Sequence, residues 1–366
     1  MNICFVSPNV NVYSETFIIN LKNGLQGKVF HCHNGQVPTQ CEGVNLAGSH
    51  SMLDRIWKRM GIIKYSLTEH YFYSFLKRNR IVVIVANYGT CGAYIAPIAA
   101  ALKIPLIVNF YGFDASVYSV LEKYRKSYQE MFRTARTIVV VSDEMKDALI
   151  KLGAPAEKIH TITCVPSSMF AAIQPDYESS QILGIGRFVD KKAPYLSILA
   201  FRIAVERYPH LRLKMVGDGP LWQVCKDLVS ALNIPNVEFV GVLKPDQIAV
   251  VFEQSFCFIQ HSKIAPDGDK EGMPVAILDA MSARLAIIST YHAGIPEIVR
   301  DGVNGFLVKE GDVAAMAERM IELSLDRELA EKLGKGGRET IQSGYTAEGY
   351  FARWNNLISS LAAKES

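Results

Sequence analysis

The chain has 366 residues, of which 49% are hydrophobic and 20% charged, and its formal net charge is +3. This length favours two domains over a single core, and the composition is typical of a folded globular protein rather than a disordered one. The sequence contains no apolar run long enough to span a bilayer, and we expect no signal peptide at its start.

Charge is distributed unevenly along the chain. Lys and Arg outnumber Asp and Glu by 18 to 11 in residues 1–170, whereas 21 basic residues stand against 25 acidic ones in residues 171–366. The front half is therefore expected to meet an anionic surface, either lipid or nucleic acid. The seven cysteines are scattered and include no CxxC pair, which favours reduced thiols in a cytoplasmic protein.

Short apolar runs alternate with helix-patterned segments from end to end, a pattern typical of α/β layering around parallel sheets. Strands are predicted in the front half at Asn2–Val6, Lys28–His31, Ile81–Ala86, Leu106–Phe110, Thr137–Val141 and Ile159–Ile162. In the back half they are predicted at Gln181–Ile185, Arg212–Val216, Val237–Val240, Cys257–Gln260 and Leu285–Ser289. Helices are predicted between them, including Tyr124–Arg136, Asp143–Leu152, Pro194–Arg207 and Val313–Ser324.

The strand–helix pattern starts again near Gln181, after the polar, proline-containing segment Ala171–Ser180, which is typical of a linker. We therefore predict two doubly wound, Rossmann-like α/β domains at residues 1–172 and 178–344. A C-terminal helix at about 345–366 is expected to pack back onto the first domain. Ligands of such sheets bind outside the carboxyl ends of the strands, so a central cleft between the domains is the expected site.

A polar loop that ends in Glu271-Gly272-Met273-Pro274 leads into an apolar-patterned helix. Pro274 fits the first helical turn, where a missing N–H costs little. The free N–H groups and the positive dipole end of this helix would face the loop. Glu271 precedes this point and Asp279 lies about two turns into the helix. An anion site with two carboxylates suits a ligand that carries both phosphates and hydroxyls, such as a nucleotide sugar.

The segment Gly184–Lys192 follows the first predicted strand of the second domain and begins as a glycine fingerprint. The third glycine of a dinucleotide-binding loop is absent, and Arg187 and Lys192 offer two cations near a helix start instead. Alternatively, Lys191 and Lys192 simply cover a solvated helix start. The glycines of the turn Gly217-Asp218-Gly219-Pro220 could bind a phosphate, but the turn fits a plain connection between a strand and a helix equally well.

Taken in chain order with Gly294–Val299 and Asp301–Val308, these motifs resemble the second domain of a retaining glycosyltransferase of family four, which has the GT-B fold. The resemblance is strong over about residues 181–340. It is weaker in the front half, where Ser14–Ile18 and Phe110–Asp114 carry it. The loop His261–Gly272 is similar to the branch that includes colanic-acid and exopolysaccharide enzymes.

The resemblance implies a role for each matching residue. Arg187 and Lys192 would hold the donor diphosphate, Glu271 would bind donor-sugar hydroxyls, and these three are the predicted catalytic residues. The predicted donor-binding residues are Gly186, Gly217, Gly272, Met273, Pro274, Val275 and Asp279. The predicted acceptor-side residues are Ser14, Glu15, Tyr111 and Asp114.

Three positions depart from the family pattern. Asp279 stands where the family has the second Glu of its E-x7-E motif, so the expected ribose contact is looser or water-mediated. Tyr111 stands where the family often has His; its hydroxyl can bind a sugar but cannot act as a base near pH 7, and Tyr111 and Phe113 could instead only pack. The Gly-Gly loop of many relatives is absent from residues 7–11.

No cofactor and no metal requirement are expected. Asp267-Gly268-Asp269 looks like a metal-binding DxD motif, but Pro266 and Gly268 make it equally a polar turn, and GT-B enzymes generally bind their donor without metal. His31 and His33 are interpreted as strand-end histidines rather than zinc ligands. The basic and aromatic segment 55–80 suits anionic lipid headgroups, or else its aromatic side chains face the core. No nucleic-acid partner is expected, because no recognised module accompanies the basic residues.

The sequence thus predicts a retaining hexosyltransferase that uses a UDP-sugar first and a GDP-sugar second. The predicted acceptor is a hydroxyl of a glycan or lipid-linked oligosaccharide in bacterial cell-surface polysaccharide biosynthesis. The expected location is the cytoplasm. If the enzyme is peripheral to the membrane, it is expected at the inner face of the cell membrane. The alternatives are a GT-B nucleotide-sugar epimerase or phosphorylase, and a non-catalytic protein that binds nucleotide sugars.

Overall fold

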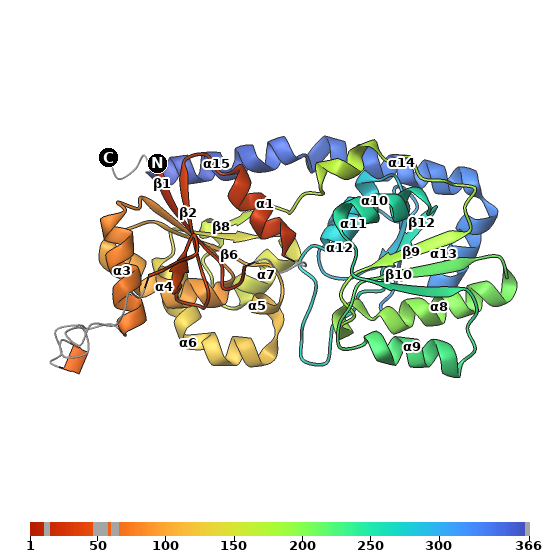
Figure 1. Ribbon diagram of the computed structural model, residues 1–366, viewed down its shortest axis with the longest axis horizontal. Helices are drawn as coiled ribbons and strands as arrows, with labels where there is room; N and C mark the ends of the chain where they lie inside the picture. Colours follow the sequence, from red (N-terminus) through yellow and green to blue (C-terminus); the bar gives the residue numbers. More distant parts are fainter. Residues whose placement is uncertain (11–14, 47–57, 60–65, 363–366) are drawn as a thin grey trace. The chain divides into compact units, whose positions relative to one another are not determined.

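The computed structural model describes residues 1–10, 15–46, 58–59 and 66–362 (Figure 1). These residues form two compact units, each with its own largely or fully parallel sheet covered by helices. Unit 1 comprises Met1–Ile162 together with Phe351–Ser366, and unit 2 comprises Thr163–Tyr350. The predicted fold class of two Rossmann-like α/β domains is confirmed.

Unit 1 contains an eight-stranded sheet in the order β4-β3-β2-β1-β5-β6-β7-β8. Its strands are parallel except where β3 pairs with β2 and with β4. The strands are β1 Asn2–Val6, β2 Lys28–His33, β3 Gln40–Cys41, β4 Val44–Asn45, β5 Val83–Asn87, β6 Leu106–Asn109, β7 Thr137–Val140 and β8 Ile159–Thr161. The helices are α1 Thr16–Gly24, α3 Leu67–Arg78, α4 Gly89–Leu102, α5 Phe113–Ser116, α6 Tyr118–Thr134 and α7 Asp143–Lys151, with the 3₁₀ turn η1 at Ala156–Lys158.

Unit 2 contains a six-stranded, fully parallel sheet in the order β11-β10-β9-β12-β13-β14. Its strands are β9 Gln181–Ile185, β10 Arg212–Val216, β11 Val237–Gly241, β12 Cys257–Ile259, β13 Ala286–Thr290 and β14 Phe306–Val308. Its helices are α8 Pro194–Arg207, α9 Trp222–Ala231, α10 Pro245–Glu253, α11 Val275–Ser282, α12 Ile295–Ile298, α13 Val313–Leu325 and α14 Arg327–Gly344, with 3₁₀ turns η2 Ser168–Ala172 and η3 Asp190–Lys192. Helix α15, Ala347–Ala362, follows.

Strand composition explains the layering. The central strands β5, β6, β7 and β13 are buried along their whole length and consist mainly of Val, Ile, Leu and Ala. A strand buried on both faces needs a continuous apolar run rather than alternation, and a parallel sheet supplies helices for both faces. The helices supply their own end signals, as at α3, where Ser66 and Glu69 form a reciprocal capping box.

Unit 2 begins at Thr163, ahead of the linker that was predicted at 171–180. The buried guanidinium of Arg338 explains the difference, because it donates to the carbonyls of Phe170 and Ile173, each at 3.4 Å. These contacts anchor Phe170 and Ile173 to α14, so the start of the predicted linker belongs to unit 2.

Helix α15 contributes a large side chain to the core from near the end of the described chain. Trp354 is fully buried, and Asn355 accepts from the backbone N–H of Gln26 at 2.8 Å and donates to the carbonyl of Gly24 at 3.0 Å. Residues more than 300 positions apart in the sequence thus share one core in unit 1.

We expect Trp354→Ala to lower the free energy of unfolding of unit 1 by about 3–5 kcal/mol, because it leaves a large cavity in a packed core. Arg353→Ala, at the neighbouring exposed position, should change it by less than about 0.5 kcal/mol. Urea unfolding monitored by circular dichroism measures both. Equal, small effects of the two substitutions would show that α15 is not part of this core.

Candidate functional site

The topology of unit 2 marks one edge of its sheet as the place for a ligand. The chain leaves the central strand β9 toward β10 and β11, then returns to build β12, β13 and β14 on the other side. Doubly wound sheets bind ligands at such a switch point, outside the carboxyl ends of the strands. Here the two segments that leave this point are Gly186–Lys192 after β9 and Gln260–Glu271 after β12.

These two segments meet in a buried ion pair. The Nζ atom of Lys192 lies 3.3 Å from Oε2 of Glu271 and 3.3 Å from Oε1 of Gln260. The Lys192 and Glu271 side chains are only 13% and 8% exposed. The other carboxylate oxygen of Glu271, Oε1, is buried without a hydrogen-bond partner among the described residues. A buried acceptor left open in this way is available to a ligand hydroxyl.

The charges around Glu271 keep it ionised. Burial alone would raise its pKa, but the positive charges of Lys192 and Lys191 outweigh burial and lower the pKa to about 2. Burial lowers the pKa of Lys192, and Glu271 opposes that shift. At neutral pH the site therefore presents a carboxylate fixed against a cation in a place shielded from water.

A histidine and a second glutamate hold the backbone at Glu271. The N–H of Glu271 donates to Nε2 of His292 at 3.1 Å, so the ring proton is on Nδ1, which lies 2.6 Å from Oε1 of Glu310. Sequence reasoning missed both residues. They follow β13 and β14. The strand predicted at Leu285–Ser289 is a signal that could have found His292, whereas no strand was predicted before Glu310.

Lys191 anchors the loop that precedes Glu271. Its buried Nζ lies 3.0 Å from Oδ1 of Asp269 and donates to the carbonyl of Lys270 at 3.0 Å. Asp267 accepts from the N–H of Asp269 at 3.0 Å. Thus Lys191 is not a solvated surface residue, and Asp267-Gly268-Asp269 forms a turn with its second carboxylate paired to a lysine. The described residues contain no cluster of three or more His, Cys, Asp or Glu side chains suited to a metal ion.

Two of the three predicted donor-site glycines, Gly186 and Gly217, pack closely against each other. Gly217 has φ +129°, and a Cβ there would lie 2.0 Å from the carbonyl oxygen of Gly186. A Cβ on Gly186 would lie 2.8 Å from Cδ of Lys192. Gly186 therefore leaves room for the Lys192 side chain, and Gly217 is buried against the Gly186 backbone, where it serves packing.

Arg187 and the start of α11 are the other predicted donor-site groups, and they lie close to Lys192 and Glu271 in the sequence. Arg187 is exposed, and no described residue forms an ion pair with it. Helix α11 begins at Val275 with Pro274 as its N-cap, and no side chain caps its first N–H groups. Gly272 and Met273, which precede the helix, are buried. A helix start without a side-chain cap is suited to an anion.

Asp279 is held by the protein backbone. Its Oδ1 accepts from the N–H of Ser167 at 2.8 Å, just before η2. Burial raises the pKa of Asp279 to about 7, although the Ser167 N–H partly opposes the shift. One of its two oxygens is therefore already engaged within unit 2.

The predicted acceptor-side residues in unit 1 have different surroundings. Asp114 is fully buried and accepts from the N–H groups of Gly89, Tyr111 and Gly112 at 2.8, 3.1 and 3.0 Å. It therefore orders the loop and does not face solvent. Tyr111 is partly exposed, and its hydroxyl donates to Oδ1 of Asn87 at 2.7 Å.

Glu15 is partly exposed and accepts from the hydroxyl of Tyr88 at 2.9 Å. Ser14 lies outside the described residues, as do 55–57 and 60–65 of the basic segment predicted to contact a membrane. Within the described part of the chain, no helix is both long and apolar enough to cross a bilayer.

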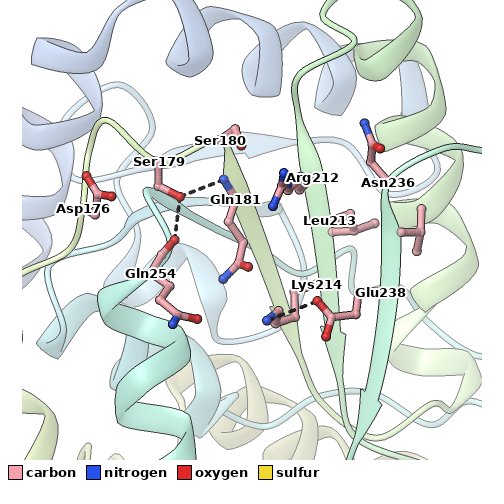
Figure 2. Close-up of a pocket in the computed structure, with 11 residues that line it drawn as sticks. Asp176, Ser179, Ser180, Gln181, Arg212, Leu213, Lys214, Asn236, Glu238 and Gln254 are labelled. Carbon is pink, nitrogen blue, oxygen red and sulfur yellow. Dashed lines mark hydrogen bonds and ion pairs between the residues drawn. The ribbon is translucent and has the colours of Figure 1, made fainter.

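A polar hollow of about 580 Å³ lies at the opposite, amino edge of the unit 2 sheet (Figure 2). It is lined by the first residues of β9, β10 and β11, which are Gln181, Arg212 and Val237. Lys214 and Glu238, which also line it, pair with each other at 3.2 Å. Because ligands of doubly wound sheets bind at the other edge, this hollow is not the candidate site.

Comparison with protein families finds two adjacent matches. The description Glycosyltransferase Family 4 applies to residues 15–165, and Glycosyl transferases group 1 applies to residues 168–340. WcaL of Escherichia coli, a glycosyltransferase named for colanic acid biosynthesis, is 28% identical over 276 residues, which are 74% of this chain and 68% of WcaL. AmsK of Erwinia amylovora, an amylovoran biosynthesis glycosyltransferase, is 30% identical over 249 residues, which are 66% of this chain and 61% of AmsK.

Solved structures share the fold at low sequence identity. HepE of Anabaena, in a complex with UDP, has a TM-score of 0.79 and 15% identity, covering 98% of this chain and 100% of HepE. Sucrose-phosphate synthase of Thermosynechococcus elongatus has a TM-score of 0.77 and 18% identity, covering 99% of each chain.

We expect Asp279→Asn to gain stability relative to the wild type as the pH rises from 5 to 8. The carboxyl titrates near pH 4 when unfolded and near 7 when folded, so the folded state binds more protons in this window and wild-type stability falls with rising pH. The gain is bounded by about 4 kcal/mol, since one pKa unit is worth about 1.4 kcal/mol.

Urea unfolding at pH 5 and pH 8 measures this difference. Asp227→Asn, at an exposed position on α9, is the matched control and should follow the wild type at both pH values. If Asp279→Asn also follows the wild type, the carboxyl is not titrating in this range.

Proposed function

The chain belongs to glycosyltransferase family 4 and has the GT-B fold, and we propose a specific reaction for it. In this proposal the enzyme transfers a hexose-type sugar with retention of the anomeric configuration. The donor is a nucleoside-diphosphate sugar, and the acceptor is a hydroxyl of a glycan or lipid-linked oligosaccharide. The observation that carries this proposal is the buried Lys192–Glu271 pair at the switch point of unit 2, where Oε1 of Glu271 is open to a ligand.

UDP is the proposed donor nucleotide, with GDP as the second choice. Support comes from HepE of Anabaena, which has been solved with UDP and with UDP-glucose and matches this chain over its full length in the latter complex. The proposed pathway is the synthesis of a bacterial cell-surface polysaccharide, because the relatives WcaL and AmsK are named for colanic acid and amylovoran biosynthesis. We place the enzyme in the cytoplasm, with peripheral contact to the inner face of the membrane.

The proposed roles follow from charge and position. Lys192, Arg187 and the uncapped start of α11 stabilise the negative charge that develops on the departing diphosphate. Glu271 accepts hydrogen bonds from hydroxyls of the donor sugar at Oε1, while its Oε2 holds Lys192 in place. Asp279 binds the ribose through the oxygen that Ser167 does not occupy.

In the transfer step, the bond between the anomeric carbon and the diphosphate oxygen breaks as the acceptor oxygen bonds to that carbon on the same face. The acceptor proton passes to the leaving diphosphate oxygen, which balances the step without a protein base. We propose that no metal ion takes part, because the second carboxylate of Asp267-Gly268-Asp269 is paired with Lys191.

We expect Glu271→Gln to reduce sugar transfer at least about 100-fold, because Gln removes the charge that holds Lys192 and orients the sugar. The measurement is incorporation of labelled sugar from UDP- and GDP-sugars into lipid-linked oligosaccharide extracted from polysaccharide-producing bacteria. Glu253→Gln, at an exposed position of the same unit, should transfer at the wild-type rate. Unchanged circular dichroism shows that both variants are folded.

Near-normal transfer by Glu271→Gln would contradict the assigned site. Product analysis by NMR decides the other parts of the proposal: an α-linked product from an α-linked donor supports retention, and a β-linked product contradicts it. An epimerised donor, or nucleotide binding without any transfer, would favour one of the alternative functions.

We also expect transfer to continue in excess EDTA. The donor diphosphate is neutralised by side chains and a helix start, so removal of divalent metal should change the rate less than about twofold. Measurement of the same labelled transfer with EDTA, and then with Mg²⁺ or Mn²⁺ restored, checks this. A rate that collapses with EDTA and recovers with metal would show that a metal ion takes part.

A further inference from the structure

The segment that follows β14 contacts the loop between β12 and Glu271 at two places. Oε2 of Glu310 accepts from the backbone N–H of Ile264 at 3.0 Å, and the N–H of Gly311 donates to Nε2 of the buried His261 at 2.7 Å. Strand β13 lies between β12 and β14 in the sheet, so the loop from β12 extends past β13 to reach these groups. The end of β14 therefore fixes the first part of the loop that carries Glu271.

The same carboxylate of Glu310 also fixes the last part of this loop, through His292. Oε1 of Glu310 lies 2.6 Å from Nδ1 of His292, and Nε2 of His292 accepts from the N–H of Glu271 at 3.1 Å. The His292 side chain is 1% exposed. One carboxylate thus connects the backbone at Ile264 to the backbone at Glu271, with one of its oxygens for each connection.

Both nitrogens of the His292 ring are engaged within the protein. A neutral imidazole has one N–H donor and one acceptor nitrogen. Here Nε2 accepts from Glu271, and the proton on Nδ1 is donated to Glu310. His292 therefore has no polar atom left for a ligand, and an effect of this residue on the reaction must pass through Glu271.

Loss of the acceptor at Nε2 would displace Glu271. A buried N–H without a partner is unfavourable, so the backbone at Glu271 would shift until that N–H is paired elsewhere. The Glu271 side chain holds Lys192 with Oε2 and leaves Oε1 open to a ligand, so both groups would shift with it. A displacement of about 1 Å in such a group costs on the order of 100-fold in rate.

We propose that His292 is a positioning residue for sugar transfer, and that Glu310 holds its ring in the tautomer and orientation that the Glu271 N–H requires. This inference rests on the proposed function, in which Glu271 binds the donor sugar. His292 acts on turnover more than on donor binding. The reason is that Arg187, Asp279 and the start of α11 contribute to donor binding from other segments.

Two substitutions at position 292 separate the hydrogen bond from the packing. His292→Phe keeps a buried ring without an acceptor, whereas His292→Gln offers a carboxamide oxygen at a reach similar to that of Nε2. We expect His292→Phe to lower kcat at least about 20-fold and to change the donor KM less than about threefold, because the sugar is misplaced rather than lost. His292→Gln should recover kcat to within about fivefold of the wild type.

The rate per binding site distinguishes positioning from a loss of folded protein. Calorimetric titration with UDP counts the competent sites in each preparation, and kcat is expressed per site. His210→Phe, at an exposed position of the same unit, is the matched control and should keep the wild-type value. A wild-type rate per site in His292→Phe, or a His292→Gln variant that is no faster than His292→Phe, would overturn the inference.

A double variant tests the link to Glu310. Glu310→Gln has one acceptor oxygen for two N–H groups, so we expect it to lower kcat by about three- to tenfold. Because both residues act through one chain of hydrogen bonds, adding Glu310→Gln to His292→Phe should lower kcat by no more than about a further twofold. Effects that multiply would show that Glu310 does not act through His292.

Hydrogen exchange at the Glu271 amide tests the positioning without reference to activity. Mass spectrometry of overlapping peptides is expected to show at least about tenfold faster exchange of this amide in His292→Phe, and near-wild-type exchange in His292→Gln. Wild-type exchange in His292→Phe would overturn the inference and leave the proposed transferase function standing. Wild-type protein that transfers no sugar would overturn the proposed function, and the exchange rates would then decide by themselves whether His292 positions Glu271.

Discussion

The buried pair of Lys192 and Glu271 is the interaction on which the candidate donor site depends. Neither charge is stable alone in so enclosed a place, and each lies in a segment that leaves a different strand. Their contact therefore ties the carboxyl ends of β9 and β12 together at the switch point. One carboxylate oxygen is used to hold the lysine, and the other stays open. A single residue thus positions a cation and offers an acceptor to the same ligand.

Side chains around the pair keep the loop in one conformation. Lys191 fixes the turn before Glu271 through Asp269, and His292 receives the Glu271 N–H while Glu310 orients its ring. Their effect is preorganisation: the polar groups that would meet a diphosphate and a sugar are already placed, so little binding free energy is spent on ordering the loop.

Sequence reasoning was most accurate where local rules suffice. Strands β9 and β10 and helix α8 have the predicted bounds, because short segments rich in Ile, Leu, Val or Met that end at a glycine, and a proline at the helix start, define them locally. The short strands β3, β4 and β14 were missed, since strands of two or three residues carry no periodic signal. The family resemblance assigned Lys192 and Glu271 to one donor site, but it could not show that Asp114 is buried or that Lys191 pairs with Asp269. Those outcomes depend on contacts between residues far apart in sequence, which no local pattern encodes.

Calorimetric titration of UDP and UMP tests most directly the proposal that Lys192 holds a donor diphosphate. A buried lysine that contacts the second phosphate should make wild-type protein bind UDP at least about tenfold more tightly than UMP, since a charge-assisted hydrogen bond contributes about 1.5–3 kcal/mol. Lys192→Met should lose this preference while it still binds UMP. An undiminished preference for UDP in the Lys192→Met variant would contradict this role of Lys192.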